Sequence, residues 1–377
     1  MPVTSLTRDR TRHHNERTWG RRSRQLTGVA SLWIGVAGAA LLVALTIPGV
    51  RDDVFSTAHA QQPLGGPLNV CHAGSLLAAF SAVEQTFRQS HPDVTITDTS
   101  GGSVDLGRRF AAGTLACDVY APADHLDIDT LLKPARLADY TIVFARGRMV
   151  LAYMAGDPKA AALPVTGTFN PPAAVPVVGS GWQDVLTGRG VRISGAHPFL
   201  DPGGYRAHML FELAQTHLKV PGLYNALLQH YMVTPADPDG TAPALGKEFN
   251  FQLTYEHIAA AAARRDPQYR YAMLPPEIDL SGARGIQYKA SVTMPGLGTA
   301  SSPPTVVMPA SPVEWGLTIP TNSPHRDLAV AFVAELLGPA GRAAFTTNGP
   351  APIVPARVTR TDAGRLPAAL KQLVTAE

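Results

Sequence analysis

After residue 60, segments with the apolar pattern of a strand alternate with segments that have the apolar spacing of a helix. Leu68 to Cys71 is an apolar stretch typical of a strand, and a Gly-Ser turn follows it. Apolar residues from Leu76 to Phe87 stand three or four positions apart, which predicts an amphipathic helix ending near His91-Pro92. The same alternation predicts a strand, a Gly-rich turn, a helix and a third strand at 94–97, 99–103, 104–112 and 118–121. Alternating units of this kind indicate a parallel sheet with helices on its faces.

A further strand-turn-helix unit is predicted later in the chain. It comprises a strand at Gly190 to Ser194, a turn around Asp201 and a helix from Tyr205 to Lys219. Strands are predicted at 306–309 and 314–319, before a helix at 327–337. The fold class is therefore α/β. Because 377 residues exceed what one ordinary core accommodates, we expect two domains.

The charge of the chain is uneven. The formal net charge is +3, but residues 1–60 hold eight of the 32 Lys and Arg residues and four of the 29 Asp and Glu residues. The remainder carries 24 basic against 25 acidic residues and is nearly neutral. It lacks the basic surface that binding to a phosphate backbone requires, so nucleic acid is not expected as a partner.

The basic excess belongs to a predicted targeting segment. Arginines precede an uncharged run from Gln25 to Val50, and Ala58-His59-Ala60 offers a small-x-small cleavage site. We expect a signal peptide at 1–60, cleaved after Ala60, and export to a periplasmic or extracytoplasmic location. The apolar run is long enough to cross a bilayer, so an uncleaved anchor is the alternative. Membrane contact is expected only through a retained leader.

Cys71 and Cys117 both lie in apolar, strand-like segments of a chain expected to meet an oxidising compartment. A disulfide is one interpretation. We favour two buried, unpaired cysteines, because facing side chains on neighbouring strands seldom have bridging geometry.

Two glycine-serine turns carry the candidate chemistry. Gly74-Ser75 and Gly101-Gly102-Ser103 each follow a predicted strand and open a predicted helix. Unpaired N–H groups and the positive end of the helix dipole favour anions there, and serine adds a hydroxyl donor. Each turn alone is more typical of an ordinary N-cap. As a pair in consecutive units they should meet at the carboxyl edge of one sheet, which predicts an oxyanion site.

Sequence signatures of enzymes are missing. The chain has no G-x-S-x-G elbow, no G-x-G-x-x-G, no Walker loop and no H-E-x-x-H, and its twelve histidines are scattered. We therefore expect no catalytic residues and no cofactor. An exported hydrolase that uses Ser75 or Ser103, and a surface interaction protein without a ligand, are the alternatives from other functional classes.

Several segments together carry a family resemblance. They occur in a fixed order over about residues 68 to 358 and read 68-LNVCHAGSL-76, 102-GSV-104, 118-DVYAPAD-124, 144-FAR-146, 150-VLAY-153, 201-DPGGYR-206, 274-LPPEIDLS-281, 313-VEWGLTIP-320, 336-LLGP-339 and 352-PIVP-355. This pattern resembles the molybdate/tungstate-binding proteins of ABC transporters, in the branch first known from archaea.

The resemblance implies a two-lobed clamshell of the type II periplasmic-binding-protein kind, with the ligand between the lobes. Lobe one is expected from 65–153 plus 307–358, lobe two from 154–306, and a C-terminal tail from 359–377. The implied function is to capture molybdate or tungstate, as cargo and not as a cofactor, and to deliver it to an ABC transporter permease. Ligand binding would favour the closed form.

The resemblance also implies the ligand-binding residues. Gly74, Ser75 and Ser103 would hold the oxyanion from lobe one, and Asp201 with the Pro202-Gly203 turn would hold it from lobe two. In that branch an aspartate and a glutamate complete a six-coordinate metal, so Asp201 is also a candidate direct ligand of molybdenum or tungsten. The alternative for Asp201 is an N-cap before Pro202.

The sequence departs from the family at the second carboxylate. Aligning Phe251 to Ala259 with the corresponding tyrosine-centred segment puts Thr254 where the glutamate is expected, so Thr254 and the adjacent Tyr255 are candidate ligand-binding residues. Glu256 would replace it only if the backbone shifts. The departure leaves both a four-coordinate and a six-coordinate metal open, and it keeps another tetrahedral oxyanion such as sulfate open as a ligand.

Overall fold

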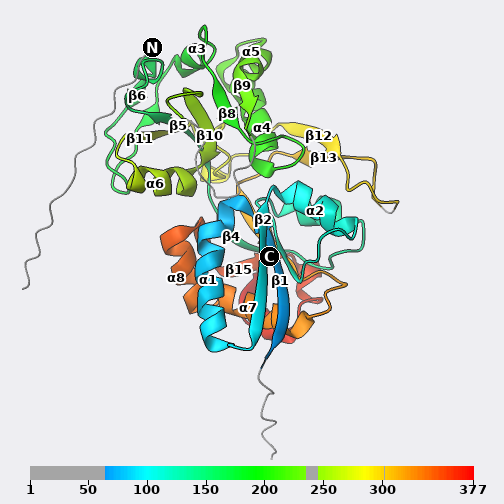
Figure 1. Ribbon diagram of the computed structural model, residues 1–377. Coiled ribbons are helices and arrows are strands. Elements are labelled where there is room, and N and C mark those ends of the chain that lie inside the picture. The colour runs from blue at the N-terminus through cyan, green and yellow to red at the C-terminus, as the bar shows by residue number, and fades with distance from the viewer. Residues whose placement is uncertain (1–63, 235–244, 301) are drawn as a thin grey trace, which may run out of the picture. The chain divides into compact units, whose positions relative to one another are not determined.

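The sheet that bears the glycine-serine turns has three parallel strands in the order β2-β1-β3 (Figure 1). Its strands are β1 (Gly66–Ala73), β2 (Val94–Gly101) and β3 (Val119–Ala121). The register pairs Ala73 with Gly101, so the two turns leave the same edge of the sheet side by side. The expected meeting of the turns at one carboxyl edge is confirmed. The computed structural model describes residues 64–234, 245–300 and 302–377.

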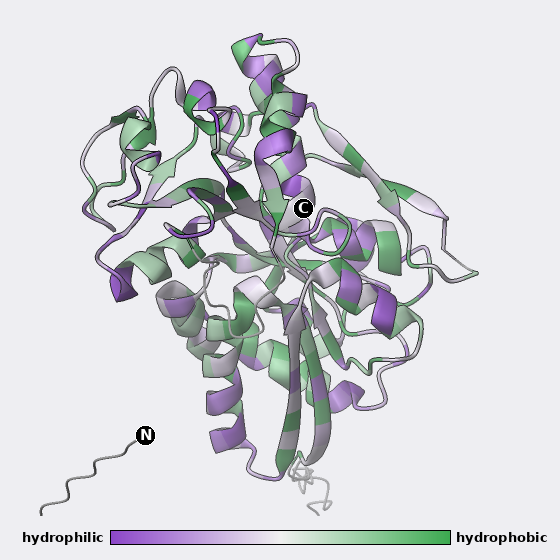
Figure 2. Cartoon of the chain, turned by 45° about the horizontal axis from the view of Figure 1, so that its top comes forward, coloured by the Kyte–Doolittle hydropathy of each residue, from purple (hydrophilic) through white to green (hydrophobic). Residues whose placement is uncertain are grey.

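Helices α1 (Leu77–Ser90) and α2 (Ser103–Ala111) follow the two turns, α1 after the short 3₁₀ turn η1 (Gly74–Leu76). The apolar stripe predicted for α1 is buried, including Phe80, Val83 and Phe87. Figure 2 shows the same division, with hydrophobic residues concentrated on the core strands and hydrophilic ones on outer turns of the helices. The predicted amphipathic helix is thus confirmed.

A four-stranded sheet extends this half of the fold. Its order is β14-β4-β15-β16, with β14 (Glu314–Leu317), β4 (Ile142–Arg146), β15 (Ala351–Val358) and β16 (Val374–Ala376). Reciprocal backbone hydrogen bonds between Tyr120 and Thr318, 3.0 and 2.9 Å long, join it to the first sheet. Helices α7 (Arg326–Leu337) and α8 (Pro339–Asn348) pack on α1.

The larger sheet has seven strands in the order β6-β7-β11-β5-β10-β8-β9. They are β6 (Val165–Thr166), β7 (Val177–Val178), β11 (Tyr269–Met273), β5 (Met149–Met154), β10 (Phe251–Tyr255), β8 (Ile193–Gly195) and β9 (Tyr231–Val233). Helices α4 (Pro202–Leu218) and α6 (Glu256–Arg265) both contact β10. Alternate residues of β10 pack with α4, whereas Val150 of the neighbouring strand β5, the partner of Thr254, packs with α6, so the two helices cover opposite faces.

Shorter elements complete the described chain. A hairpin pairs β12 (Ser291–Pro295) with β13 (Thr305–Pro309). The remaining helices are η2 (Ile128–Leu132), η3 (Ala160–Ala162), α3 (Trp182–Leu186), α5 (Leu223–His230), η4 (Ala283–Gly285), α9 (Arg360–Ala363) and α10 (Ala368–Lys371).

The structure is a two-lobed α/β fold, as expected. We call the two smaller sheets with their helices lobe one, and the seven-stranded sheet with its helices lobe two. The boundaries expected from the sequence stay a prediction, and strand pairing refines them. Strand β5 pairs with β10 and β11 of lobe two, so we place the first crossing at Gly147-Arg148 and not after 153. Residues 359–377, expected as a tail, pack on lobe one through α10 and β16.

The predicted signal peptide and the alternative of an uncleaved membrane anchor both concern residues 1–60. The predicted signal peptide and its cleavage after Ala60 lie outside the described residues. Within the described part of the chain, no single helix is long and apolar enough to span a membrane, and α7 and α8 meet that criterion only as a pair bent by 61°.

The preference for unpaired cysteines was wrong. Cys71 and Cys117 form a disulfide with a Cα–Cα distance of 5.6 Å. The strand register explains the error, because Cys71 pairs with Tyr120, and Cys117 lies before β3 begins. The two residues are therefore not the facing strand pair on which the sequence argument rested, and the approach to β3 brings the sulfur atoms together.

We expect the disulfide to stabilise the fold measurably. The double variant Cys71→Ser/Cys117→Ser should lose about 3 to 4 kcal/mol of unfolding free energy in urea, because the bridge closes a loop of 46 residues in the unfolded chain. Dithiothreitol should destabilise the wild-type chain by a similar amount and leave the variant unchanged. A loss below about 1 kcal/mol would contradict this expectation.

Candidate functional site

Ser75 lies in the turn between β1 and α1, and its hydroxyl has a defined neighbour. The indole Nε1 of Trp315 donates to Ser75 Oγ over 3.0 Å. Because an indole N–H only donates, Ser75 must point its own proton elsewhere. The residue that caps η1 is Ala73, without a side-chain hydrogen bond, so the N-cap interpretation of Ser75 is wrong.

Ser103 is fully buried at the start of α2 and shows the same arrangement. The backbone N–H of Ala123 donates to Ser103 Oγ over 2.9 Å, which leaves the hydroxyl proton free to donate. The N-cap of α2 is Gly102, again without a side-chain cap, so Ser103 is not an N-cap either. Both helix starts keep first-turn N–H groups that lack an intrahelical partner.

The start of α4 in lobe two meets the start of α2 directly. The N–H of Asp105 donates to the carbonyl of Leu200 over 3.2 Å. A Cβ at Gly102 would come within 2.6 Å of that same carbonyl oxygen, so only glycine allows this approach. The structure therefore brings the Gly102-Ser103 turn of lobe one against Leu200-Asp201 of lobe two.

Asp201 is the N-cap of α4, with Pro202 as the first helical residue. Its Oδ1 accepts from the N–H of Gly203 over 2.7 Å. Burial raises the pKa of Asp201 above its usual value, against the lowering effects of the Gly203 hydrogen bond and of Arg206. The cap alternative is thus confirmed, and it leaves Oδ2 for other contacts.

Tyr255 ends β10 and supplies a third hydroxyl. Arg206 donates from Nη1 to Tyr255 Oη over 2.9 Å, and since arginine only donates, the Tyr255 proton must also point elsewhere. A Cβ built at Gly203 lies 3.8 Å from Tyr255 Oη, and the Tyr255 and Trp315 rings lie 5.0 Å apart. Tyr255 is therefore close to the turn before α4 and to Trp315, which is the residue that contacts Ser75.

Three hydroxyls thus share one property. Those of Ser75, Ser103 and Tyr255 each accept from a group that can only donate, so each is left as a donor. A continuous path of contacts links them, because Arg206 Nη1 also donates to the Ala123 carbonyl over 2.8 Å. Gly74 adjoins this set, since its Cβ position lies 4.0 Å from the Gly101 carbonyl.

Thr254 does not join the others. It pairs with Val150 in the β10–β5 ladder, and strand alternation puts it on the face opposite Tyr255, towards α6. Glu256 forms an ion pair with Arg148, 3.1 Å from Oε2 to Nε. Burial, more than the opposing effect of Arg148, raises the pKa of Glu256. Neither residue brings a second carboxylate to Asp201.

A buried ionic network connects the lobes beside these hydroxyls. The Arg206 guanidinium, 1% exposed, lies 3.0 Å from Asp124 Oδ2, and Tyr205 donates to the same oxygen over 2.9 Å. Burial alone would lower the pKa of Arg206, but Asp124 and two tyrosines raise it above its usual value. Burial and the charge of Asp124 raise the pKa of Asp127 well above its usual value, which favours its protonated form.

Arg206, Asp124 and Trp315 escaped the sequence analysis as site residues. Each stands within a quoted motif, but no motif gives the pairing of one with another. The available signal was a charged residue on the buried face of a helix, because α4 buries Arg206 between Tyr205 and Ala207. Charged side chains are rarely buried unless they are paired.

The Arg206–Asp124 pair should dominate the stability of the contact between lobes. We expect Arg206→Met to lower the unfolding free energy in urea by about 3 to 5 kcal/mol, because it leaves the Asp124 carboxylate buried without its partner. Arg109→Met, which breaks the exposed pair with Asp105 on α2, is the matched control and should cost less than about 1 kcal/mol. Equal losses for both variants would refute this assignment.

Solved structures share the fold. The sulfate-binding protein SubI from Mycobacterium tuberculosis aligns with a TM-score of 0.51 at 16% identity, over 76% of this chain and 87% of that protein. The periplasmic molybdate-binding protein of Azotobacter vinelandii aligns with a TM-score of 0.52 at 15% identity, over 76% and 99% of the two chains.

Sequence relatives give the family. A solute-binding protein of Methanoculleus marisnigri is 30% identical over 328 residues, which cover 81% of this chain and 86% of the relative. The molybdate/tungstate-binding protein WtpA of Pyrococcus abyssi is 24% identical over 310 residues, or 74% and 83% of the two chains. The model of the bacterial extracellular solute-binding proteins matches residues 68–349. The chain therefore belongs to the bacterial extracellular solute-binding protein family.

Proposed function

We propose that this solute-binding protein captures a tetrahedral oxyanion, molybdate or tungstate, between its lobes and delivers it to the permease of an ABC transporter. The observation that carries the proposal is the set of three hydroxyls, Ser75, Ser103 and Tyr255, each of which accepts from a protein donor and keeps its own proton available to donate. A site made of outward donors suits a ligand that only accepts hydrogen bonds. The named ligands of WtpA support this choice.

Backbone groups add to the hydroxyl donors. The turns at Gly74-Ser75 and Gly102-Ser103 open helices side by side, and the Pro202-Gly203 turn opens α4 opposite them. Each start presents N–H groups and the positive end of a helix dipole. Together they stabilise a dianion without placing a cationic side chain in direct contact with it.

The charges around the turns fit an anion. Arg206 neutralises Asp124, and the raised pKa values of Asp127 and Asp201 favour their uncharged forms. Because Asp201 uses Oδ1 as a helix cap, we propose capture by hydrogen bonds around a four-coordinate metal. Thr254 and Glu256 then take no part in binding.

A hydrolase is the weaker alternative. A serine nucleophile needs a base that accepts its proton. Among the described residues, the histidine near Ser75 is His257, whose Nε2 lies 2.8 Å from the Ser75 carbonyl and not from its hydroxyl. Burial lowers the pKa of His257 to about 4, so its neutral ring donates to that carbonyl and does not activate the serine.

Calorimetry on the purified full chain should detect tight binding of molybdate and tungstate. Ser75→Ala and Ser103→Ala should each cost about 1.5 to 3 kcal/mol of binding free energy, because each removes a donor to a charged ligand. Ser323→Ala is the matched control, since its hydroxyl bonds Asp118 before β3, and it should keep full affinity. Sulfate binding at equal affinity would favour the sulfate alternative. No binding of any oxyanion would refute the proposal.

A substitution at Asp201 distinguishes helix capping by this residue from direct coordination of the bound metal. Asparagine also caps helices, so Asp201→Asn should keep α4 intact while removing the carboxylate. We expect the variant to bind molybdate within about threefold of wild type, or more tightly, because a negative charge near a dianion is removed. X-ray absorption of the wild-type complex should show four oxygens around the metal. A fifth oxygen, lost in the variant with a large fall in affinity, would make Asp201 a direct ligand.

A further inference from the structure

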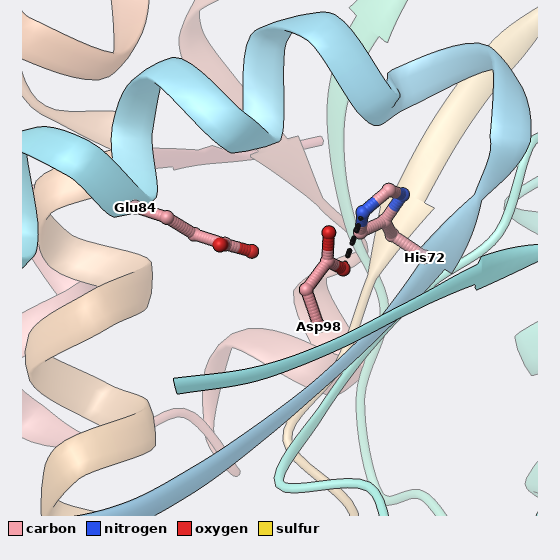
Figure 3. A group of neighbouring side chains, drawn as sticks. All are labelled: His72, Glu84 and Asp98. Atoms are coloured by element: carbon pink, nitrogen blue, oxygen red, sulfur yellow. Dashed lines mark ion pairs between the residues drawn. The ribbon is translucent and has the colours of Figure 1, made fainter. Parts of the chain in front are cut away.

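Three ionisable side chains converge between helix α1 and the strands β1 and β2 (Figure 3). His72 comes from the end of β1, Asp98 from β2 and Glu84 from α1. His72 Nε2 lies 2.8 Å from Asp98 Oδ1, and one ligand atom of each residue lies within 4.8 Å of those of the other two. In Figure 3 the Glu84 carboxylate extends from its helix towards the other two groups.

The orientation of His72 is fixed from its other nitrogen. Nδ1 lies 2.8 Å from the carbonyl oxygen of Ala73, which can only accept, so Nδ1 carries a proton. The ring is fully buried and packs on Phe80, with 4.5 Å between ring centroids. Nε2 is therefore held towards Asp98. Histidine ligands of metals are oriented in the same way, by a hydrogen bond from the second nitrogen to a carbonyl or carboxylate.

Glu84 gives an independent sign of a ligand. The residue is 2% exposed, and its Oε2 accepts from Arg88 Nη2 over 2.9 Å. Its Oε1 is buried and has no hydrogen-bond partner. An unsatisfied carboxylate oxygen costs free energy in a buried position.

We propose that His72, Glu84 and Asp98 bind a divalent transition-metal cation, for which Zn²⁺ is the natural probe. One imidazole and two carboxylates, with water at the remaining position, form a ligand set that zinc accepts. The imidazole favours zinc over magnesium or calcium, which prefer oxygen ligands only. A cation would neutralise both carboxylates and satisfy Glu84 Oε1.

The geometry allows a cation to enter the cluster and the three side chains to close around it. The Asp98 side chain is 25% exposed, whereas His72 is fully buried, so a cation would enter past Asp98. Zinc holds nitrogen and oxygen ligands at about 2.0 to 2.2 Å, so ligand atoms around it stand about 3.3 Å apart. Binding would therefore move Asp98 Oδ1 away from His72 Nε2 and draw Glu84 Oε1 inward, both through side-chain torsions.

A cation bound at His72 would also affect the Gly74-Ser75 turn, which follows His72 in the chain. The Ala73 carbonyl that accepts from His72 belongs to the same peptide group as the Gly74 N–H. A cation on Nε2 makes Nδ1–H a stronger donor, and this polarises that peptide towards a stronger Gly74 donor. This consequence rests on the proposed function, whereas binding of the cation does not.

Titration of the chelator-treated full chain with Zn²⁺ alone tests the proposal, with no oxyanion present. We expect one tight site whose affinity falls at least tenfold in Glu84→Gln and in Asp98→Asn. His91→Gln and Asp93→Asn change the same residue types beyond the end of α1 and serve as controls that keep wild-type affinity. X-ray absorption at the zinc edge should show one imidazole among oxygen ligands.

Other outcomes would overturn the proposal. Absence of a stoichiometric site in wild type would mean that a proton on His72 Nε2 holds the pair with Asp98. Equal losses in the cluster variants and the control variants would locate the zinc elsewhere. Circular dichroism without zinc checks that each variant folds, and Asp98→Asn, at a partly exposed position, keeps the test decisive if Glu84→Gln does not fold.

Discussion

The Arg206 guanidinium is the group on which the contact between the lobes depends. It is 1% exposed, and a buried cation is tolerated only when it is paired and hydrogen-bonded. Its partners come from both lobes: Asp124 and the Ala123 carbonyl from lobe one, and Tyr255 from lobe two. Satisfying one side chain therefore fixes the segment before η2, the start of α4 and the end of β10 relative to one another.

The hydrogen bonds of Arg206 also determine which groups of the proposed site can donate. Because Arg206 donates to Tyr255, that hydroxyl keeps its own proton available to donate, and Trp315 and the Ala123 N–H act likewise on Ser75 and Ser103. The protein thus leaves three hydroxyl protons available for donation, and only the contact with Tyr255 uses a charged group. An oxyanion, which offers acceptors on every side, is the ligand that benefits, and selectivity then depends on donor spacing.

The carboxyl end of strand β1 contributes to both proposed sites, the anion-binding turn and the cation-binding cluster. Beyond Ala73 the chain turns into the donors of Gly74 and Ser75, whereas one residue earlier His72 faces Glu84 and Asp98 on the α1 side of the sheet. The Ala73 carbonyl joins them, since it accepts from His72 and shares its peptide group with Gly74. The turn that we propose for anions and the cluster that we propose for a cation are therefore neighbours along the chain.

The sequence alone determined the α/β class, the helix at α1, the two glycine-serine turns and their meeting at one sheet edge, because periodicity and parallel pairing are local consequences of residue order. It did not determine the Cys71–Cys117 bridge or the place of β5 in lobe two, since both follow from strand register. Nor did it separate Thr254 from Tyr255, which adjoin in sequence but face opposite sides of β10. The pairing of Arg206 with Asp124 joins residues 82 positions apart, and only the packing of the two lobes brings them together and removes them from water.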